Sequence, residues 1–394
     1  MTQTALSAFR TNRAKEVCNQ HSVDLLIASV AENIEYLSGF FPLGVASLYS
    51  TEAYLVFCPS SGQKAVITAA ADAPTLLELG FSGDIYPVGG FCFTYIDGDR
   101  MSDSVRSVLK KRYASVSDAL EAAICSMNQA QARIAIDESR MPVTTWRKLE
   151  HAFPACELLS AASIFPEIRR IKHPEEIALL KKSANITESS FLRLLPFIEE
   201  GVSEAELYWH FNEGIIQEGA TPYFCAITID ERSAFVDTYP QPFSKVKNGS
   251  VLRFDFGCIY KGFRSDIARM VIVGENKKAE AYYAGVLAGE EAAIQALRPG
   301  ISAGEIFDIA VNTVKQHIPH FERHHCGHGI GMASYDFPSI CAGNPALIEQ
   351  DMTLCIETPY YELGWGGVMV EDTVRITKDG AEFLTDTSRE LIHL

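Results

Sequence analysis

The sequence carries few basic residues for its length. Its 394 residues include 34 Lys and Arg against 50 Asp and Glu, so the formal net charge is −16 at pH 7. Nucleic acids and anionic membrane surfaces are bound through clustered Lys and Arg side chains. The shortage therefore argues against both partners. The acidic surplus is typical of a soluble protein and leaves a few carboxylates available to bind metal.

Long apolar runs, targeting segments and cysteine motifs are also missing. The most apolar stretch, residues 23–31, is far shorter than the roughly 20 residues of a membrane-spanning helix and contains Asp24 and Ser29. The first 16 residues lack the apolar core of a signal peptide. Ten cysteines are scattered without a Cys-x-x-Cys pair, which argues against a disulfide framework or a thiolate zinc site. We expect a cytoplasmic protein without a membrane anchor.

The first part of the chain has the pattern of an α/β domain. Short β-branched runs are typical of strands, and they alternate with longer helical stretches such as residues 6–20 and 102–112. The expected strands are residues 23–28, 53–58, 65–68 and 133–136. No Gly-rich phosphate loop follows any of them, so a nucleotide site is not supported.

A basic segment divides the chain, and a weak repeat follows it. The stretch before Pro174 is basic and ends in a helix-starting Pro-Glu-Glu, which predicts domains at residues 1–165 and 166–394. Farther on, residues 201–206 and 300–305 share a Gly followed by the Ser and Glu spacing of a capping box. Each opens an expected amphipathic helix after another helix. The match predicts a duplicated α/β half, although capping boxes are common enough for chance to produce it.

Two aspartates lie in what reads as a β-hairpin. Residues 251–256 and 266–273 have strand patterns, and a two-residue turn at Tyr260-Lys261 would set Asp255 directly opposite Asp266. Like charges this close inside apolar strands are destabilising unless a cation lies between them. The alternative is that both aspartates are solvated on an edge hairpin.

One histidine and two glutamates extend this set. His328 lies between glycines in a histidine-rich segment, residues 324–331, and imidazole is a common ligand for transition metals. Glu357 and Glu371 are embedded in apolar, strand-like sequence, where a buried unpaired acid is costly. Four carboxylates and one imidazole suit a pair of Mn, Co, Fe or Zn ions.

At this point the sequence resembles the aminopeptidase P, prolidase and creatinase family, over nearly the whole chain. The stretch RRIKHPEEI at residues 169–177 is similar to the family's domain junction. The five ligand positions match in order and spacing, and the motifs GHGIG, IETP and VEDT contain three of them. The matching ligands are Asp255, Asp266, His328, Glu357 and Glu371.

The resemblance implies a fold and a mechanism. The fold would be an N-terminal α/β domain followed by a pita-bread α+β domain, whose pseudo-two-fold halves surround two divalent metal ions. Manganese is the first expectation, with cobalt, zinc or iron as alternatives. The reaction would be hydrolysis of an Xaa-Pro peptide bond by a metal-bridging hydroxide, with Glu357 as general base and His324 at the substrate or oxyanion. Relatives also suggest a homodimer.

Three substrate-handling positions depart from this pattern. Where the proline-directed members carry a histidine, this chain has Asp237-Thr238; a second family histidine is Tyr335, and the family arginine is Met369. A pocket lacking three positive groups would favour a neutral or cationic substrate, and Asp237 could bind an amine. The alternatives are a hydrolase or lyase of a small non-peptide compound, as for ectoine or dimethylsulfoniopropionate, and a non-enzymatic binding protein.

Overall fold

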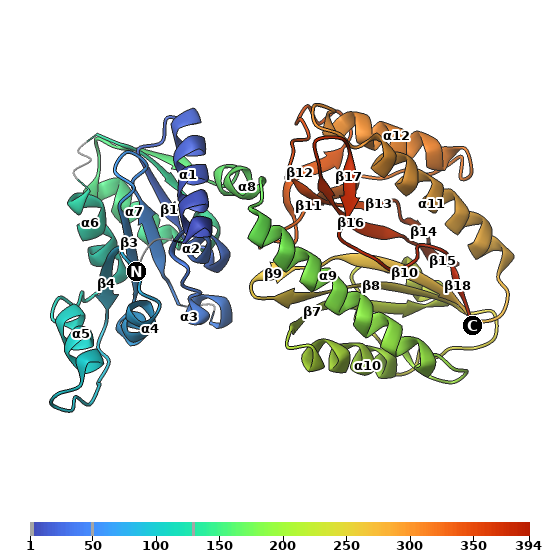
Figure 1. The fold of residues 1–394 in the computed structure, drawn as a ribbon, viewed down its shortest axis with the longest axis horizontal. Helices are drawn as coiled ribbons and strands as arrows, with labels where there is room; N and C mark the ends of the chain where they lie inside the picture. Colours follow the sequence, from blue (N-terminus) through green and yellow to red (C-terminus); the bar gives the residue numbers. More distant parts are fainter. Residues whose placement is uncertain (1–3, 49–50, 128–130) are drawn as a thin grey trace. The chain divides into compact units, whose positions relative to one another are not determined.

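The computed structural model describes residues 4–48, 51–127 and 131–394. The chain forms two compact units, Met1–Arg169 and Arg170–Leu394, which are coloured from blue to green and from green to red in Figure 1. The expected fold class, an N-terminal α/β domain followed by a second domain of helices and strands, is confirmed. Among the described residues, no helix is long and apolar enough to cross a membrane.

The N-terminal unit is built on a six-stranded mixed sheet. Its strand order is β4-β3-β2-β1-β5-β6, with β1 antiparallel to β2 and parallel to β5. The four expected strands form, with β5 matching its predicted bounds. The strands are β1 (Leu25–Ala28), β2 (Tyr54–Phe57), β3 (Lys64–Ala69), β4 (Asp84–Val88), β5 (Arg133–Ile136) and β6 (Glu157–Ser160). The helices are α1 (Ala5–Gln20), α2 (Ala31–Ser38), α3 (Leu43–Ser47), α4 (Ala73–Glu78), α5 (Arg100–Leu109), α6 (Val116–Ser126), α7 (Val143–Ala152) and α8 (Ile164–Arg169).

The C-terminal unit contains one ten-stranded sheet, a separate two-stranded sheet of β14 and β15, and four α-helices. Its main strand order is β12-β11-β13-β16-β10-β8-β7, and β9, β17 and β18 pair at its sides. The helices are α9 (Pro174–Leu194), α10 (Glu204–Gln217), α11 (Lys277–Ala296) and α12 (Ala303–Lys315). The strands are β7 (Thr221–Ile229), β8 (Val251–Tyr260), β9 (Phe263–Arg264), β10 (Ile267–Ile272), β11 (His325–Gly329), β12 (Asp336–Cys341), β13 (Thr353–Glu357), β14 (Tyr360–Glu362), β15 (Gly366–Val368), β16 (Glu371–Ile376), β17 (Ala381–Phe383) and β18 (Ile392–His393).

The predicted repeat corresponds to two equivalent helix pairs, α9–α10 and α11–α12 (Figure 1). Ser203 and Ser302 each cap the second helix of a pair in a complete capping box. The loops before them are held alike: the Gly201 amide donates to Val246 O at 2.8 Å, and the Gly300 amide donates to Ile348 O at 2.9 Å. The two helix pairs therefore share their cap and the backbone hydrogen bond before it, as the repeat predicts.

Alternation along the strands separates the core from the site. Leu252, Phe254 and Phe256 of β8 pack in the hydrophobic core beside α9 and α10. Leu354 and Ile356 of β13 pack beside α11 and α12. Because successive strand residues point to opposite faces, the residues between them project from the other face of the sheet.

Candidate metal centre

The acidic residues line up across four neighbouring strands. Glu357 of β13 pairs with Glu371 of β16, which pairs with Ala268 of β10, which pairs with Asp255 of β8. Paired residues share one face of a sheet, so the three acids project together. Ala268 has the smallest side chain of the row and lies between Asp255 and Glu371. A small side chain therefore separates Asp255 from Glu371 in this row.

The predicted hairpin is correct, but its register was wrong by two residues. Tyr260 pairs with Phe263, so the turn is Lys261-Gly262, and Asp255 faces Ala268 instead of Asp266. Both turn residues have positive φ, 48° and 82°, which is the conformation of hairpin turns that favour Gly. A shift of two residues preserves the face, so Asp266 remains a diagonal neighbour of Asp255.

A second row runs beside the first. His328 of β11 pairs with Cys355 of β13, which pairs with Thr373 of β16. Asp266, just before β10, approaches this row, and its Oδ2 lies 3.7 Å from His328 Nε2. One donor atom from each of Asp266, His328, Cys355 and Glu371 lies within 4.8 Å of the others, and all four residues are buried.

The electrostatics of this cluster fit a divalent cation. Burial raises the pKa of Asp255 to about 6 despite the opposing effect of Arg253, and burial together with neighbouring acids raises the pKa of Asp266 and Glu371 well above their usual values. Oε1 of Glu371 is buried without a hydrogen-bond partner. Burial lowers the pKa of His328, which favours the neutral imidazole that metals bind. Asp255 is paired with Arg253, whereas Asp266 and Glu371 have no Lys or Arg partner among the described residues, and a metal ion would supply that positive charge.

Two arginines and a histidine border the acids. Arg253, fully buried on β8, donates from Nη1 to Asp255 Oδ2 at 2.9 Å. Arg323 Nη2 lies 3.2 Å from Glu357 Oε2, and His325 Nδ1 lies 3.2 Å from Glu357 Oε1. Positive groups therefore border the acids even though the three divergent positions, Asp237-Thr238, Tyr335 and Met369, carry none. The family resemblance did not single out Arg253, Arg323 or His325.

The two adjacent histidines lie in different surroundings. His325 is half-buried, and its ring centroid lies 6.2 Å from that of His328. His324, the residue expected near the substrate, is exposed. The structure thus directs His325, and not His324, toward Glu357.

The three divergent pocket positions are spread around the cluster. Tyr335 is exposed, and its ring centroid lies 4.1 Å from that of His328. Asp237 is exposed on the loop before β8, near enough for its charge to raise the pKa of Asp255. Thr238 accepts a hydrogen bond from Arg232. Met369 is buried, with its Sδ 3.8 Å from Arg253 Nη1.

Sequence reasoning missed Arg253 and Cys355, although strand periodicity points to both. Each lies two residues before a proposed ligand, Asp255 or Glu357, on a predicted strand. Residues two apart on a strand share a face, so alternation alone would have placed Arg253 and Cys355 beside the acids.

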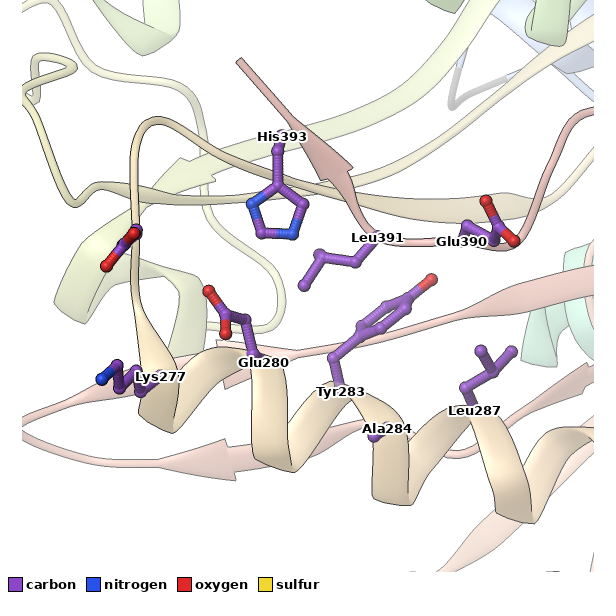
Figure 2. Close-up of a pocket in the computed structure, with 9 residues that line it drawn as sticks. Lys277, Glu280, Tyr283, Ala284, Leu287, Glu390, Leu391 and His393 are labelled. Atoms are coloured by element: carbon purple, nitrogen blue, oxygen red, sulfur yellow. The ribbon is translucent and has the colours of Figure 1, made fainter.

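A separate cavity of about 630 Å³ lies between α11 and the C-terminal segment. Figure 2 shows Glu280, Tyr283 and Leu287 projecting from the helix toward Leu391 and His393. None of its lining residues belongs to the acidic rows. The cavity is therefore distinct from the candidate metal centre.

Comparisons with known proteins agree with this geometry. A family model described as metallopeptidase family M24 matches residues 178–378, and the creatinase/prolidase N-terminal domain matches residues 10–171. The Bacillus subtilis (strain 168) protein YkvY, provisionally named a dipeptidase, is 28% identical over 92% of this chain and 93% of that protein.

An Xaa-Pro dipeptidase of Pyrococcus horikoshii is 26% identical over 69% of this chain and 86% of that protein. The crystal structure of a prolidase from Thermococcus sibiricus has a TM-score of 0.82 and 26% identity, covering 98% of both chains. Because the first model alone spans more than half of the sequence, this chain belongs to metallopeptidase family M24.

Proposed function

We propose that this protein is a metal-dependent exopeptidase that hydrolyses short peptides with proline after the N-terminal residue. The observation that carries the proposal is the buried set of acids and His328 on one sheet face, in which Glu371 Oε1 has no hydrogen-bond partner. The names of the relatives from P. horikoshii and T. sibiricus point to the same substrate class.

Five residues would hold two divalent ions in this proposal. They are Asp255, Asp266, His328, Glu357 and Glu371. When bound, the ions would polarise the scissile carbonyl and lower the pKa of an attacking water molecule. Manganese is the first expectation from the family, with cobalt, zinc and iron as alternatives.

The residues of the chain itself would orient the substrate and move protons. Glu357 lies at the edge of the acidic row, where its carboxylate would act as general base and then return a proton to the leaving amine. The contacts of Arg323 and His325 with its two oxygens would fix its orientation. His325, half-buried beside Glu357, would donate a hydrogen bond to the developing oxyanion. This role was first expected for His324.

A second candidate is hydrolysis or lysis of a small non-peptide compound. The observation that favours it is the exposed rim, where Tyr335 and Asp237 occupy positions at which the proline-directed relatives carry histidines. Tyr335 donates one hydrogen bond but carries no positive charge near neutral pH. Asp237 would suit a cationic group.

An assay on matched peptides separates the two candidates. Protein loaded with Mn²⁺ or Co²⁺ is incubated with Xaa-Pro dipeptides and tripeptides and with Xaa-Ala counterparts, and release of the N-terminal residue is measured. We expect cleavage of the Xaa-Pro series and its loss in Glu357→Gln. Absence of turnover across the whole panel, with metal content verified, would favour the non-peptide candidate.

Location and assembly are part of the same proposal. All ten cysteines lie among the described residues and are free, which suits a reducing, cytoplasmic compartment. The homodimer rests on the resemblance to relatives. Light scattering coupled to size-exclusion chromatography would measure the molar mass, and a single-chain mass of 43.4 kDa would contradict the dimer.

A further inference from the structure

Cys355 differs from the other buried cysteines of the C-terminal unit in lying among the proposed metal ligands. Cys258 and Cys326 belong to the hydrophobic cores beside the helices, although the sulfur of Cys258 also lies 3.4 Å from Ser183 Oγ. Cys355 is equally buried, but it lies on the polar face of β13, two residues before Glu357. Its Sγ lies 3.4 Å from Thr373 Oγ1 and 3.8 Å from the backbone oxygen of Asp266. The thiol is therefore set among donor atoms rather than apolar side chains.

The position of Cys355 in the sheet is central to the second row. It pairs with His328 on one side and with Thr373 on the other. Its sulfur belongs to the four donor atoms that lie within 4.8 Å of one another, together with Asp266, His328 and Glu371. Three of these four residues are proposed ligands.

Two independent observations indicate that this group is open to a ligand. Glu371 is only 2% exposed, and its unpartnered Oε1 lies 3.9 Å from His328 Nε2. Nδ1 of His328 lies 3.0 Å from Gly329 O, so the protonated nitrogen donates there and Nε2 keeps a free electron pair. Glu371 Oε1 and His328 Nε2 therefore each keep an unused electron pair in the cluster that includes the sulfur of Cys355.

We propose that Cys355 is a ligand to the ion held by Asp266, His328 and Glu371, and that its sulfur makes this position selective for thiophilic divalent metals. The inference rests on the proposed function, because it concerns one of the two ions. On binding, the S–H bond breaks, the sulfur–metal bond forms and one proton passes to solvent. Sulfur and imidazole donors favour Zn²⁺, Co²⁺ or Fe²⁺ over Mn²⁺. The metal preference would thus differ from the manganese expected first.

Cobalt spectroscopy tests the sulfur–metal bond directly. The full-length metal-free protein is titrated with Co²⁺, and bound cobalt is measured by elemental analysis alongside the near-ultraviolet spectrum. We expect a sulfur-to-cobalt charge-transfer band that grows with the first equivalent. Cys355→Thr should bind cobalt without the band. Cys326→Ala, which alters a core cysteine on the adjacent strand, should retain it.

Competition between metals provides a second readout. With equal concentrations of Zn²⁺ and Mn²⁺, wild-type protein should bind zinc, and Cys355→Thr should lower this preference by about tenfold or more. Cobalt bound to the wild type without the band would overturn the ligand assignment, and so would a band that persists in Cys355→Thr. Failure to bind any divalent ion would instead overturn the proposed function. If Cys355→Thr does not fold, the wild-type spectrum can still overturn the assignment, because cobalt bound without the band excludes a sulfur ligand.

Discussion

At the scale of single residues, Arg253 is a fully buried cation beside the proposed centre. Its guanidinium contacts Asp255 Oδ2 and donates through Nη2 to the backbone oxygens of Phe235 and Val236 at 2.9 and 3.1 Å. Arg253 therefore links a proposed ligand to the loop that carries Asp237. Met369 lies directly against it. A positive charge two residues before Asp255 thus borders the site from β8.

Replacing Arg253 with Met would leave Asp255 without its guanidinium. Breaking one side of a buried ion pair costs about 3 kcal/mol or more, so the free energy of unfolding of the metal-free protein should fall by about that amount. The loss should be smaller in metal-loaded protein, because a cation compensates Asp255. Urea denaturation with and without metal measures both values. Met369→Leu, which removes no charge, is the control; an equal loss in both metal states would contradict the compensation.

The two adjacent histidines provide a matched pair of variants. His325→Ala should reduce kcat/KM for the cleaved peptide by about 100-fold, because a hydrogen bond to the oxyanion and a contact with Glu357 are lost. His324→Ala should leave kcat/KM nearly unchanged, because its side chain is exposed. Steady-state kinetics with metal content verified compares the two. A larger loss of kcat/KM in His324→Ala than in His325→Ala would assign the hydrogen bond to the oxyanion to His324 instead.

The sequence could predict the proposed ligands of the candidate centre, but not the side chains next to them. Acids embedded in apolar strands and the GHGIG motif pointed to five residues, and the structure brings these five to one face of the sheet. His325 and His324 could not be told apart, because β11 has register shifts between His325 and Gly329 that alternation does not foresee. Arg253 and Cys355 were open to prediction by periodicity alone.

At the scale of elements, the β8–β10 hairpin positions both aspartates. The prediction set the turn at Tyr260-Lys261, but two-residue hairpin turns favour Gly at their second position, which points to Lys261-Gly262. Gly262 has a φ of 82°, and Lys261 before it has a φ of 48°. Asp266 still lies on the predicted face of the sheet, because strand alternation has a period of two and the register differs by two residues. The starts of α10 and α12 were easier to predict, because a capping box marks each of them.

Gly257 permits the close approach of the hairpin's two strands. A Cβ at this position would lie 1.9 Å from the backbone oxygen of Ser265, next to Asp266. Gly257→Ala should therefore lower the free energy of unfolding by about 3 kcal/mol and weaken metal binding, since the strand carrying Asp266 must move. Thermal denaturation and metal titration measure both effects. Gly90→Ala, where the Cβ meets nothing within 4 Å, is the control; equal stability of the two variants would contradict the steric argument.

At the scale of the whole molecule, metal removal should make stability depend on pH. The folded metal-free protein holds Asp255 at a pKa of about 6, and Asp266 and Glu371 have pKa values well above those of the unfolded chain. Between the unfolded and folded pKa values the folded state binds more protons. The stability that these protons provide is complete below about pH 4 and is lost as pH rises through the folded values.

Metal-loaded protein should lack this loss, because cations balance the ionised carboxylates. We therefore expect the difference in melting temperature between metal-loaded and chelator-treated protein to widen by several degrees from about pH 5 to about pH 8. Differential scanning calorimetry in matched buffers measures it. A difference that narrows toward high pH would contradict the buried, uncompensated state of these acids.

The narrow seam of the sheet also has a consequence for any attempt to divide the chain. Strands β10 and β16 are joined through one registered pair, Ala268 with Glu371. The proposed aspartate ligands lie on one side of this pair in the sheet, and His328 and the proposed glutamate ligands lie on the other. A fragment that ends between β10 and β16 would therefore carry only part of the proposed ligand set.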